Sequence, residues 1–438
     1  MLVRKELRYC GFATVLIIFL IFNIVACQMQ TNQTPASSVK TPSTVLTYTK
    51  PQQSTATPKV TYKLLDPTLV PIQRRMQNHL TRSCIQIINN ANQDEDQNNS
   101  LVLYDRNRQL PYLYDKKNDE ALPLNNANKM LIDISPNYRW LVYLQEIGTN
   151  SQLIVQSFSG ENIYKIKLAS LRENATLGGW VGDENIILSL SGHQPASILV
   201  VNPFTNEQQI LTPNFPDIYN NDAWDWSFSG RTIYSPDFRF VVYPATFGDA
   251  PTGDVLWDAQ NRERIAIIPI GIGGNLVAVP QWSPDWKFFA VKVMGRNADE
   301  LYSASLDGTV TGLTNLLKLF PDVTTQIRTW KWSPDSQKIA FWLDFYDKDI
   351  LKEERLMVID IKSGEITDYC LSGDNIQITT EIPDFTPAPA WSPDSAYLLV
   401  EQRKNLTEST LILMNLEKKT ASSIGKNTYP YGWMKEGP

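Results

Sequence analysis

The chain has 438 residues and a formal net charge of −6 at pH 7, with 20% charged and 42% hydrophobic residues. An acidic chain without a basic stripe is a poor candidate for nucleic-acid binding, because phosphate recognition depends on clustered Lys and Arg side chains. The only two histidines are His79 and His193, and the sequence contains no CxxC or HExxH motif, so no zinc site is indicated.

Residues 1–26 have the pattern of an export signal. The basic stretch MLVRKELRYC precedes the apolar run GFATVLIIFLIF, which is too short for a typical transmembrane helix. Residues 24–27 read IVAC and resemble a bacterial lipobox, which implies cleavage before Cys27 and lipid attachment to its thiol. Two acyl chains are enough for stable anchoring. We therefore expect a lipid-anchored protein on the exported face of a cell membrane or outer membrane; the alternative is an uncleaved anchor.

The stretch that follows divides into a tether and a less regular segment. Thr, Ser, Gln and Pro dominate residues 27–65, which is typical of a disordered tether. Residues 66–100 lie between this tether and the repeats that follow from residue 101, and we call them the pre-propeller segment. Within it, the run LVPIQRRMQNHL predicts a short helix that covers one face of the domain that follows.

From residue 101 onward one short phrase recurs. The clear copies are ISPNYRWLVY at Ile134, YSPDFRFVVY at Tyr234, WSPDWKFFAV at Trp282, WSPDSQKIAFW at Trp332 and WSPDSAYLLV at Trp391. Two degenerate copies are WVGDENIIL at Trp180 and WMKEG at Trp433. The acid or amide of successive copies is spaced by 46, 54, 48, 50, 59 and 42 residues. This period matches a four-stranded propeller blade of about 40–50 residues.

Each copy predicts a strand, a tight turn and a second strand. Pro favours the turn, and Asp or Asn bonds the backbone two residues further on. The run after the turn is apolar and β-branched or aromatic, as in a strand. The Trp or Tyr before the turn is large enough to fill the space between neighbouring sheets. Paired strand-like runs between copies, such as RLMVIDIKSG and EITDYCL, bring the total to four strands per period.

The last copy predicts how the ring closes. The strand near Trp433 is followed by five residues, whereas residues 101–124 contain three strand-like runs without such a turn. We expect these four strands to form one sheet, because this pairing removes an exposed edge. The prediction is an all-β, seven-bladed propeller over residues 101–438. Six or eight blades remain alternatives, because WDWSFSG and YSPDF compete for one inner-strand position within residues 215–235.

Four cysteines are present, and two remain once the signal and lipid site are set aside. Cys10 leaves with the signal and Cys27 takes lipid. Cys84 and Cys370 form an even pair in an oxidising compartment, so a disulfide between the pre-propeller segment and the ring is one arrangement that the sequence allows. The alternative is two separate buried thiols.

One charged strand connection is a candidate binding loop. The segment LDFYDKDILKEE, residues 343–354, is longer than its counterparts, and such loops often carry recognition. The alternative is a solvated insertion. The candidate residues are Asp344, Phe345, Tyr346, Asp347, Asp349, Glu353 and Glu354.

The repeated W-S-P-D phrase resembles the propeller repeats of TolB-type periplasmic proteins and of prolyl oligopeptidases and dipeptidyl peptidases. The resemblance covers roughly residues 101–438 and implies a WD-repeat-like propeller. It also implies protein partners at the face or mouth of a central channel. No catalytic residue is transferred, because the peptidases carry their nucleophile in a different domain.

We therefore expect a monomeric, non-catalytic protein-binding or scaffold module of the cell envelope, without cofactor or metal. One alternative is a glycan-active enzyme, which would need two carboxylates about 5–9 Å apart in the channel. Another is a ligand-capturing sensor, which would need an aromatic, concave pocket. Trp224 and Trp226 in the stretch DAWDW offer aromatic surface for a sugar, or pack between blades.

Overall fold

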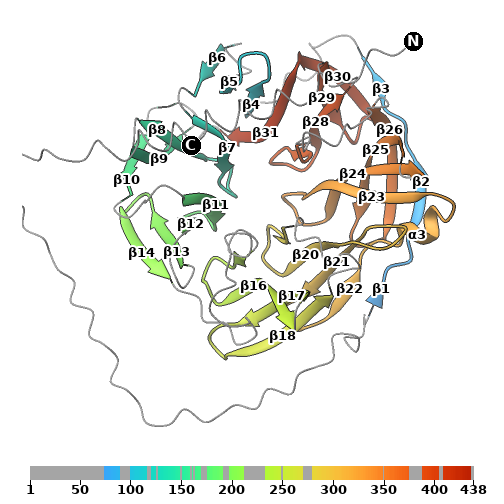
Figure 1. Ribbon diagram of the computed structural model, residues 1–438. Helices are drawn as coiled ribbons and strands as arrows, with labels where there is room; N and C mark the ends of the chain where they lie inside the picture. The colour runs from blue at the N-terminus through green and yellow to red at the C-terminus, as the bar shows by residue number, and fades with distance from the viewer. Residues whose placement is uncertain are drawn as a thin grey trace, which may run out of the picture. The chain divides into compact units, whose positions relative to one another are not determined.

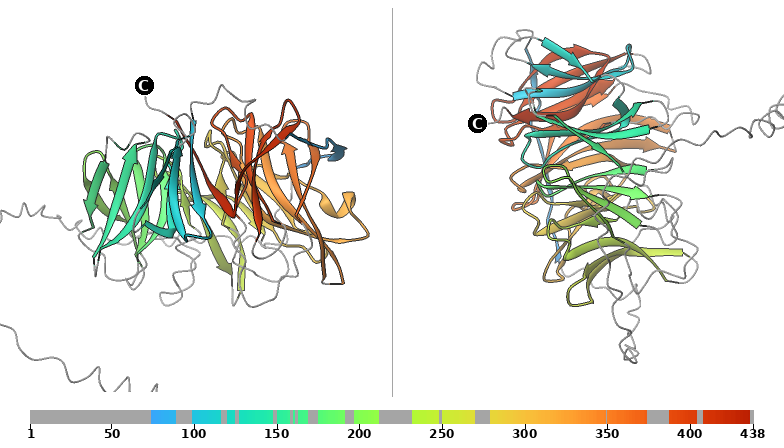
Figure 2. Two further views of the ribbon diagram at one scale, coloured as in Figure 1. Left: turned by 90° about the horizontal axis from the view of Figure 1, so that it is seen from above. Right: turned by 90° about the vertical axis from the view of Figure 1, so that its left-hand side faces the viewer.

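The computed structural model describes fifteen stretches of the chain between residues 74 and 435. They are residues 74–88, 99–115, 120–124, 127–147, 150–157, 160, 163–168, 175–190, 197–211, 232–247, 250–269, 279–348, 350–373, 387–403 and 408–435. These residues form a ring of seven antiparallel sheets around a central axis (Figure 1). The views turned by 90° show that the strands run from one face of the ring to the other (Figure 2).

Each sheet is one blade and contains four strands of the ring, ordered from the channel outward. Blade 1 has β31 (Thr428–Lys435), β4 (Asn99–Asp105), β5 (Leu110–Asp115) and β6 (Glu120–Pro123). Blade 2 has β7 (Ala127–Ile134), β8 (Trp140–Ile147), β9 (Asn150–Ser157) and β10 (Ile163–Lys167). Blade 3 has β11 (Ala175–Val181), β12 (Asn185–Leu190), β13 (Ser197–Asn202) and β14 (Glu207–Leu211).

Blade 4 has β15 (Ile233–Tyr234), β16 (Phe240–Phe247), β17 (Ala250–Asp258) and β18 (Glu263–Pro269). Blade 5 has β19 (Gln281–Trp282), β20 (Phe288–Val293), β21 (Glu300–Ser305) and β22 (Val310–Gly312). Blade 6 has β23 (Thr324–Trp332), β24 (Lys338–Asp347), β25 (Ile350–Asp360) and β26 (Glu365–Gly373). Blade 7 has β27 (Ala390–Trp391), β28 (Tyr397–Arg403), β29 (Ser409–Asn415) and β30 (Thr420–Lys426). The short helix α3 (Leu316–Leu319) joins blades 5 and 6.

Blade 1 closes the ring as the sequence predicted. Its inner strand β31 comes from the C-terminal end of the chain and pairs antiparallel with β4, so that Trp433 lies opposite Leu101. The count of seven blades is also confirmed. In blade 4 the YSPDF copy supplies the inner strand β15, which resolves the competition with WDWSFSG. Trp224 and Trp226 lie outside the described residues.

The repeated turn connects the inner strand of a blade to its second strand, and its polar side chains add hydrogen bonds to the backbone bonds that close it. In the five clear copies the Ser hydroxyl donates to the Asp or Asn side chain at 2.5–2.7 Å. The same hydroxyl accepts the backbone N–H five residues further on at 2.8–3.1 Å. The Asp or Asn oxygen accepts the N–H two residues on, as predicted, at 2.9–3.3 Å. We call the side of the ring that carries these turns the turn face, and the opposite side the hairpin face.

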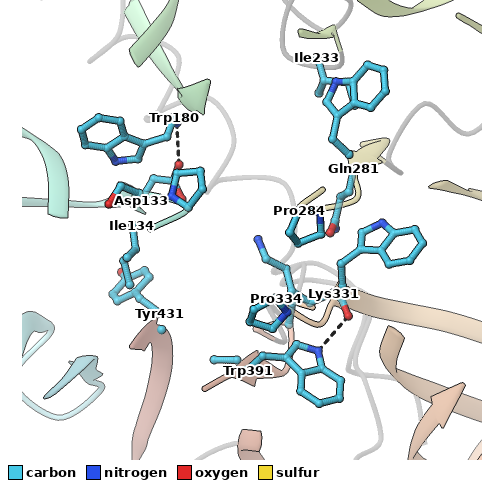
Figure 3. A pocket seen from close by; sticks show the side chains of 18 of the residues that line it. Asp133, Ile134, Trp180, Ile233, Gln281, Pro284, Lys331, Pro334, Trp391 and Tyr431 are labelled. Atoms are coloured by element: carbon cyan, nitrogen blue, oxygen red, sulfur yellow. Dashed lines mark hydrogen bonds between the residues drawn. The ribbon is translucent and has the colours of Figure 1, made fainter. Parts of the chain in front are cut away.

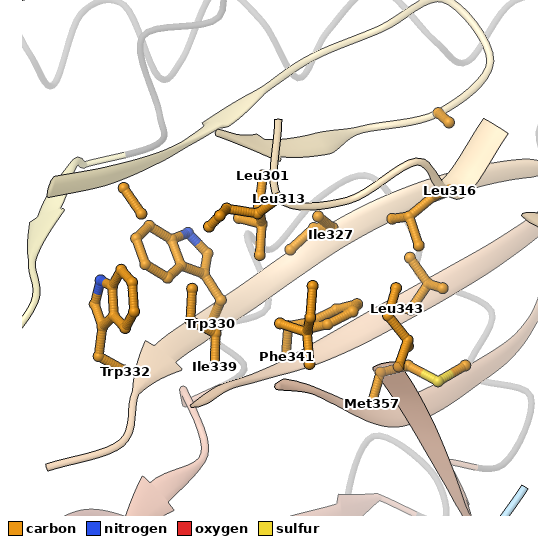
Figure 4. Close-up of a cluster of buried hydrophobic side chains, with 14 of the residues drawn as sticks. Leu301, Leu313, Leu316, Ile327, Trp330, Trp332, Ile339, Phe341, Leu343 and Met357 are labelled. Atoms are coloured by element: carbon orange, nitrogen blue, oxygen red, sulfur yellow. The ribbon is translucent and has the colours of Figure 1, made fainter. Parts of the chain in front are cut away.

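The hydrophobic core is divided into layers between neighbouring blades. Seven clusters of buried side chains each combine residues from two adjacent blades. Figure 4 shows the layer between blades 5 and 6, where Leu301 of blade 5 faces Trp330 and Phe341 of blade 6. At about 25 cal/mol per Å² of buried apolar surface, these layers are the main favourable term of the fold.

The segment before blade 1 runs along the outer rim of three blades. We call residues 74–88 the strap. Its short strands β1 (Arg74–Arg75), β2 (His79–Arg82) and β3 (Gln86–Ile87) add in parallel to β22, β26 and β30. Figure 1 shows them in blue outside blades 5, 6 and 7. The helix expected within residues 69–80 is therefore wrong for the described part. Its backbone N–H groups pair instead with blade edges, as from Met76 to the carbonyl of Gly312 at 2.9 Å.

Two further contacts fix the strap. Cys84 forms a disulfide with Cys370 of β26, with their Cα atoms 4.7 Å apart. The Asn78 side-chain amide donates to the carbonyls of Leu313 and Gly364 at 3.0 and 2.9 Å, and so joins blades 5 and 6. The disulfide is one of the two arrangements that the sequence left open, the other being two separate thiols. It links positions 286 residues apart in the chain, one in the strap and one in the ring.

Replacing both Cys84 and Cys370 by Ala tests the contribution of this covalent link. A disulfide that closes a long loop stabilises a fold by about 2–5 kcal/mol, mainly by restricting the unfolded chain. We expect a lower unfolding midpoint and faster amide exchange at Met76, Ser83 and Ile88, whose N–H groups pair with the blade edges. Amide exchange followed by mass spectrometry measures this. Unchanged protection of the strap would contradict the expectation.

Candidate functional site

The inner strands of all seven blades enclose a cavity along the axis of the ring. Its volume is about 580 Å³, within the range of small-molecule sites. One structurally equivalent residue per blade lines it, namely the residue immediately before the inner-strand residue that opens each repeated phrase. We call these positions the channel ring. They are Asp133, Gly179, Ile233, Gln281, Lys331, Ala390 and Gly432.

Asp133 is held in a fixed position by the neighbouring blade. Its carboxylate accepts a hydrogen bond from the backbone N–H of Trp180 at 2.8 Å. Gly179 makes this approach feasible, because a Cβ there would lie 2.6 Å from the Asp133 Oδ2 atom, and its φ of +98° suits glycine. Burial raises the pKa of the Asp133 carboxyl, while the positive charge of Lys331 and the backbone N–H groups of Trp180 and Ile134 oppose that rise.

Lys331 lies across the channel from Asp133. Around the ring, two blades separate them on one side and three on the other. Figure 3 shows the Lys331 side chain extending into the channel toward the side of Asp133. The backbone near Lys331 is fixed by its neighbours. Its carbonyl accepts a hydrogen bond from the Trp391 indole at 3.1 Å, and the Gln281 amide donates to the adjacent carbonyl of Trp330 at 3.0 Å.

The walls of the channel are largely aromatic and apolar. Tyr138 and Trp286 line the cavity from the third position after Ser in their turns, where φ is +65° and +60°. Pro334, Pro389 and Tyr431 add further apolar surface. A concave, aromatic wall with a few convergent polar groups is the usual composition of a ligand site.

The candidate binding loop of residues 343–354 is a paired hairpin rather than a loop. Strands β24 and β25 extend to Asp347 and Ile350, and Asp344 lies directly opposite Glu354. Both carboxylates are buried. Arg328 of β23 contacts the Asp344 carboxylate at 2.8 Å and the Glu354 carboxylate at 3.6 Å. These two residues are therefore part of the interior of blade 6 at its hairpin-face end.

The other residues of this segment have separate surroundings. Phe345 is buried against Phe320 and lies under the Arg355 guanidinium. The Tyr346 hydroxyl donates to Asp344 at 3.2 Å, and Glu353 pairs with Arg355 at 2.5 Å. Asp347 is exposed at the tip, and Asp349 lies outside the described residues. Recognition by this tip stays a prediction.

Other candidates from the sequence fall outside the channel. His79 lies in the strap, 3.7 Å from Glu365. Cys27 and His193 lie outside the described residues. Within the described stretches, no three His, Cys, Asp or Glu side chains are grouped to hold a metal ion. No helix in the same stretches has the length and apolar character to cross a membrane.

Comparison with known proteins adds no family assignment. No protein-family model and no curated protein matches the chain. Among solved structures, TolB from Acinetobacter baumannii is 13% identical, with 75% of this chain and 79% of that chain covered and a TM-score of 0.39. The periplasmic gluconolactonase of Pseudomonas aeruginosa is 12% identical, with 75% and 95% covered and a TM-score of 0.44. A protein from Lactobacillus plantarum is 11% identical, with 77% and 99% covered and a TM-score of 0.46. These similarities carry no argument about function, and the fold rests on the strand pairings described above.

The channel ring was not singled out by the sequence patterns, although a signal was present. Aligning the seven copies on their opening residue places Asp133 and Lys331 one residue upstream of that residue. Adjacent residues of a strand point to opposite faces. The predecessor of the residue that packs between blades therefore lies on the other face of the inner strand, and in the structure it lines the cavity.

The buried Glu354 predicts a measurable pH dependence of stability. Burial, opposed by Arg328 and reinforced by Asp344, raises the pKa of Glu354 to about 7 from its ordinary value of 4.5. The folded state then binds this proton more tightly than the unfolded state, so this contribution to stability falls as pH rises from 4.5 through about 7. Relative to wild type, Glu354→Gln should be more stable at a pH of about 8 than at a pH of about 5.

Unfolding midpoints at the two pH values measure this difference. Glu417→Gln, at an exposed turn of blade 7, serves as the matched control and should show no such change. An equal effect of Glu354→Gln at both pH values would contradict the expected ionisation.

Proposed function

We propose that the protein is an exported, lipid-anchored binding module of the cell envelope, and that its central channel recognises a partner protein. The observation that carries this proposal is the open cavity of about 580 Å³ bounded by the channel ring. An aromatic wall and two charged side chains give such a cavity both contact area and orientation. The rest of the ring serves as a rigid support for it.

The exported location is supported by the disulfide between Cys84 and Cys370. Disulfides persist mainly in oxidising compartments and are uncommon in the cytosol. The lipobox-like sequence ending at Cys27 points in the same direction. The strap that carries Cys84 follows the tether in the chain. A load applied through the tether would thus reach three blades through strand pairing and one covalent bond.

A non-catalytic role is the form of the proposal that the channel supports best. A glycan-active enzyme would need two carboxylates at suitable separation. The lining formed by described residues contains a single carboxylate, Asp133, and one amine, Lys331. These two opposite charges can orient a charged or polar group that binds in the channel. The aromatic wall also favours a second candidate function, the capture of a small ligand by the same channel.

Site-specific photo-cross-linking tests the role of the channel in partner binding. A photoreactive residue at position 286, on the channel wall, is introduced into the full chain in native membranes. We expect one reproducible cross-linked partner. Its yield should fall by at least about tenfold in Lys331→Glu, because charge reversal inside a buried contact strongly weakens binding. The matched control Lys362→Glu, at an exposed turn of the same blade, should retain the cross-link.

Two outcomes would overturn the partner-binding proposal. One is the absence of any reproducible cross-link. The other is a cross-link whose yield is the same in Lys331→Glu and Lys362→Glu, because binding would then not depend on the channel.

Replacing Cys27 by Ser tests the anchor separately. The thiol is the expected acylation point, so we expect the protein to leave the membrane fraction and to lose the mass of the diacylglyceryl group. Membrane fractionation and intact-mass measurement check this. Retention of the variant in the membrane without lipid would instead support the uncleaved anchor.

A further inference from the structure

The channel ring carries a separated pair of opposite charges. Of its seven positions, only Asp133 and Lys331 are ionisable. They come from blades 2 and 6, so that they face each other across the axis (Figure 3). Among the described residues, Lys331 has no acidic side chain within ion-pair distance, although its charge acts on the Asp133 carboxyl. The two groups interact through the channel without direct contact.

The other five positions of the channel ring carry no charge, and three of them are Gly or Ala. On one side of the ring, the two intervening positions are Ala390 and Gly432, which have almost no side chain. On the other side, the position next to Asp133 is Gly179. The Gln281 amide is held against the backbone of blade 6 by its bond to the Trp330 carbonyl at 3.0 Å. Neither charge is therefore neutralised by a neighbouring member of the ring.

An occupant that leaves these charges unpaired is disfavoured. A ligand that fills the channel removes water from both groups, and a desolvated charge without a partner is unfavourable. A simple anion would pair with Lys331 and approach Asp133 unfavourably, and a simple cation would do the reverse. A neutral sugar can hydrogen-bond to both groups through its hydroxyls, but it neutralises neither charge. An occupant with one cationic and one anionic group satisfies both.

We propose that the channel binds a zwitterion, a free α-amino acid or short peptide, with its ammonium group at Asp133 and its carboxylate at Lys331. This inference rests on one part of the proposed function, namely that the channel is the site of recognition. The aromatic and proline walls, including Trp286 and Pro389, would contact the apolar part of the ligand. The Trp180 N–H holds the carboxylate of Asp133 at 2.8 Å, so this end of the site is preorganised.

Calorimetric titration of the full chain in detergent micelles tests the ligand class. The probes are the standard α-amino acids and a set of dipeptides. The best zwitterion is then compared with its amide, which lacks the carboxylate charge, and with its deaminated acid, which lacks the ammonium. We expect each singly charged analogue to bind at least about 30-fold more weakly, as for the loss of one partner of a buried charge pair.

Matched variants assign the two ends of the site. Lys331→Met should bind the zwitterion and its amide equally well. Asp133→Asn should bind the zwitterion and its deaminated acid equally well. The amide introduced by Asp133→Asn retains an oxygen for the Trp180 N–H, so the fold is expected to persist. If Asp133→Asn lowers the unfolding midpoint, the test is decided by Lys331→Met. That variant changes a side chain that extends into the channel. Lys362→Met is the control and should bind as wild type.

Three results would overturn the inference: no saturable binding up to about 10 mM, equal binding of the singly charged analogues, or unchanged binding by the two channel variants. A cross-linked partner that depends on Lys331, with no zwitterion binding, would leave the proposed function standing while this inference falls. Zwitterion binding without a cross-linked partner would support this inference and overturn the proposed function. Displacement of the partner by the best zwitterion would show that the partner presents the same pair of charges.

Discussion

The structure depends on one constraint: each sheet is apolar on both faces, and a single blade cannot bury either. In blade 6, Phe341 and Leu343 pack toward blade 5, whereas Ala340 and Trp342 pack toward blade 7. Such a sheet is stable only between two neighbours. A ring satisfies this for every blade, provided that the first and last are joined. The pairing of β31 with β4 makes that join and buries Trp433 against blade 7.

Local chemistry explains why this part of the fold could be predicted from sequence. The Ser–Pro–Asp turn is closed by hydrogen bonds between residues at most five positions apart, so one short phrase contains all of the groups that form it. The turns also contact one another. The N–H of Asp285 donates to Ser336 of the next blade at 3.0 Å, and that of Asp335 donates to Ser395 at 3.2 Å. The same phrase thus forms the turn and sets its spacing from the next blade.

The strap was misread as a helix, and the burial of two carboxylates in the long hairpin was not predicted, because the groups that they contact lie outside a local window of sequence. The strap has strands of two to four residues, too short for an alternating pattern, and they pair with edges more than 200 residues away. In the hairpin, Asp344 and Glu354 suggested an exposed charged loop. They are buried because Arg328, on a different strand, contacts both carboxylates. Neither arrangement is encoded in a local window.

The channel ring shows what a repeated fold leaves undetermined. The fold requires the residue that packs between blades and the turn that follows, but the residue before them is free to differ from blade to blade. Its seven positions hold Asp, Gly, Ile, Gln, Lys, Ala and Gly. Gly179 and Gly432 are the exceptions, because a Cβ would lie 2.6 Å from the Asp133 carboxylate at the first and 2.7 Å from the Ile134 side chain at the second.

The choice of Asp133 in one blade thus constrains its neighbour, whereas no contact among the described residues constrains Lys331 in this way. Lys331 is exposed and forms no ion pair among the described residues, so its charge contributes little to the stability of the fold. Two opposite charges that do not touch, at positions that the fold does not dictate, are therefore better explained by a ligand between them than by stability.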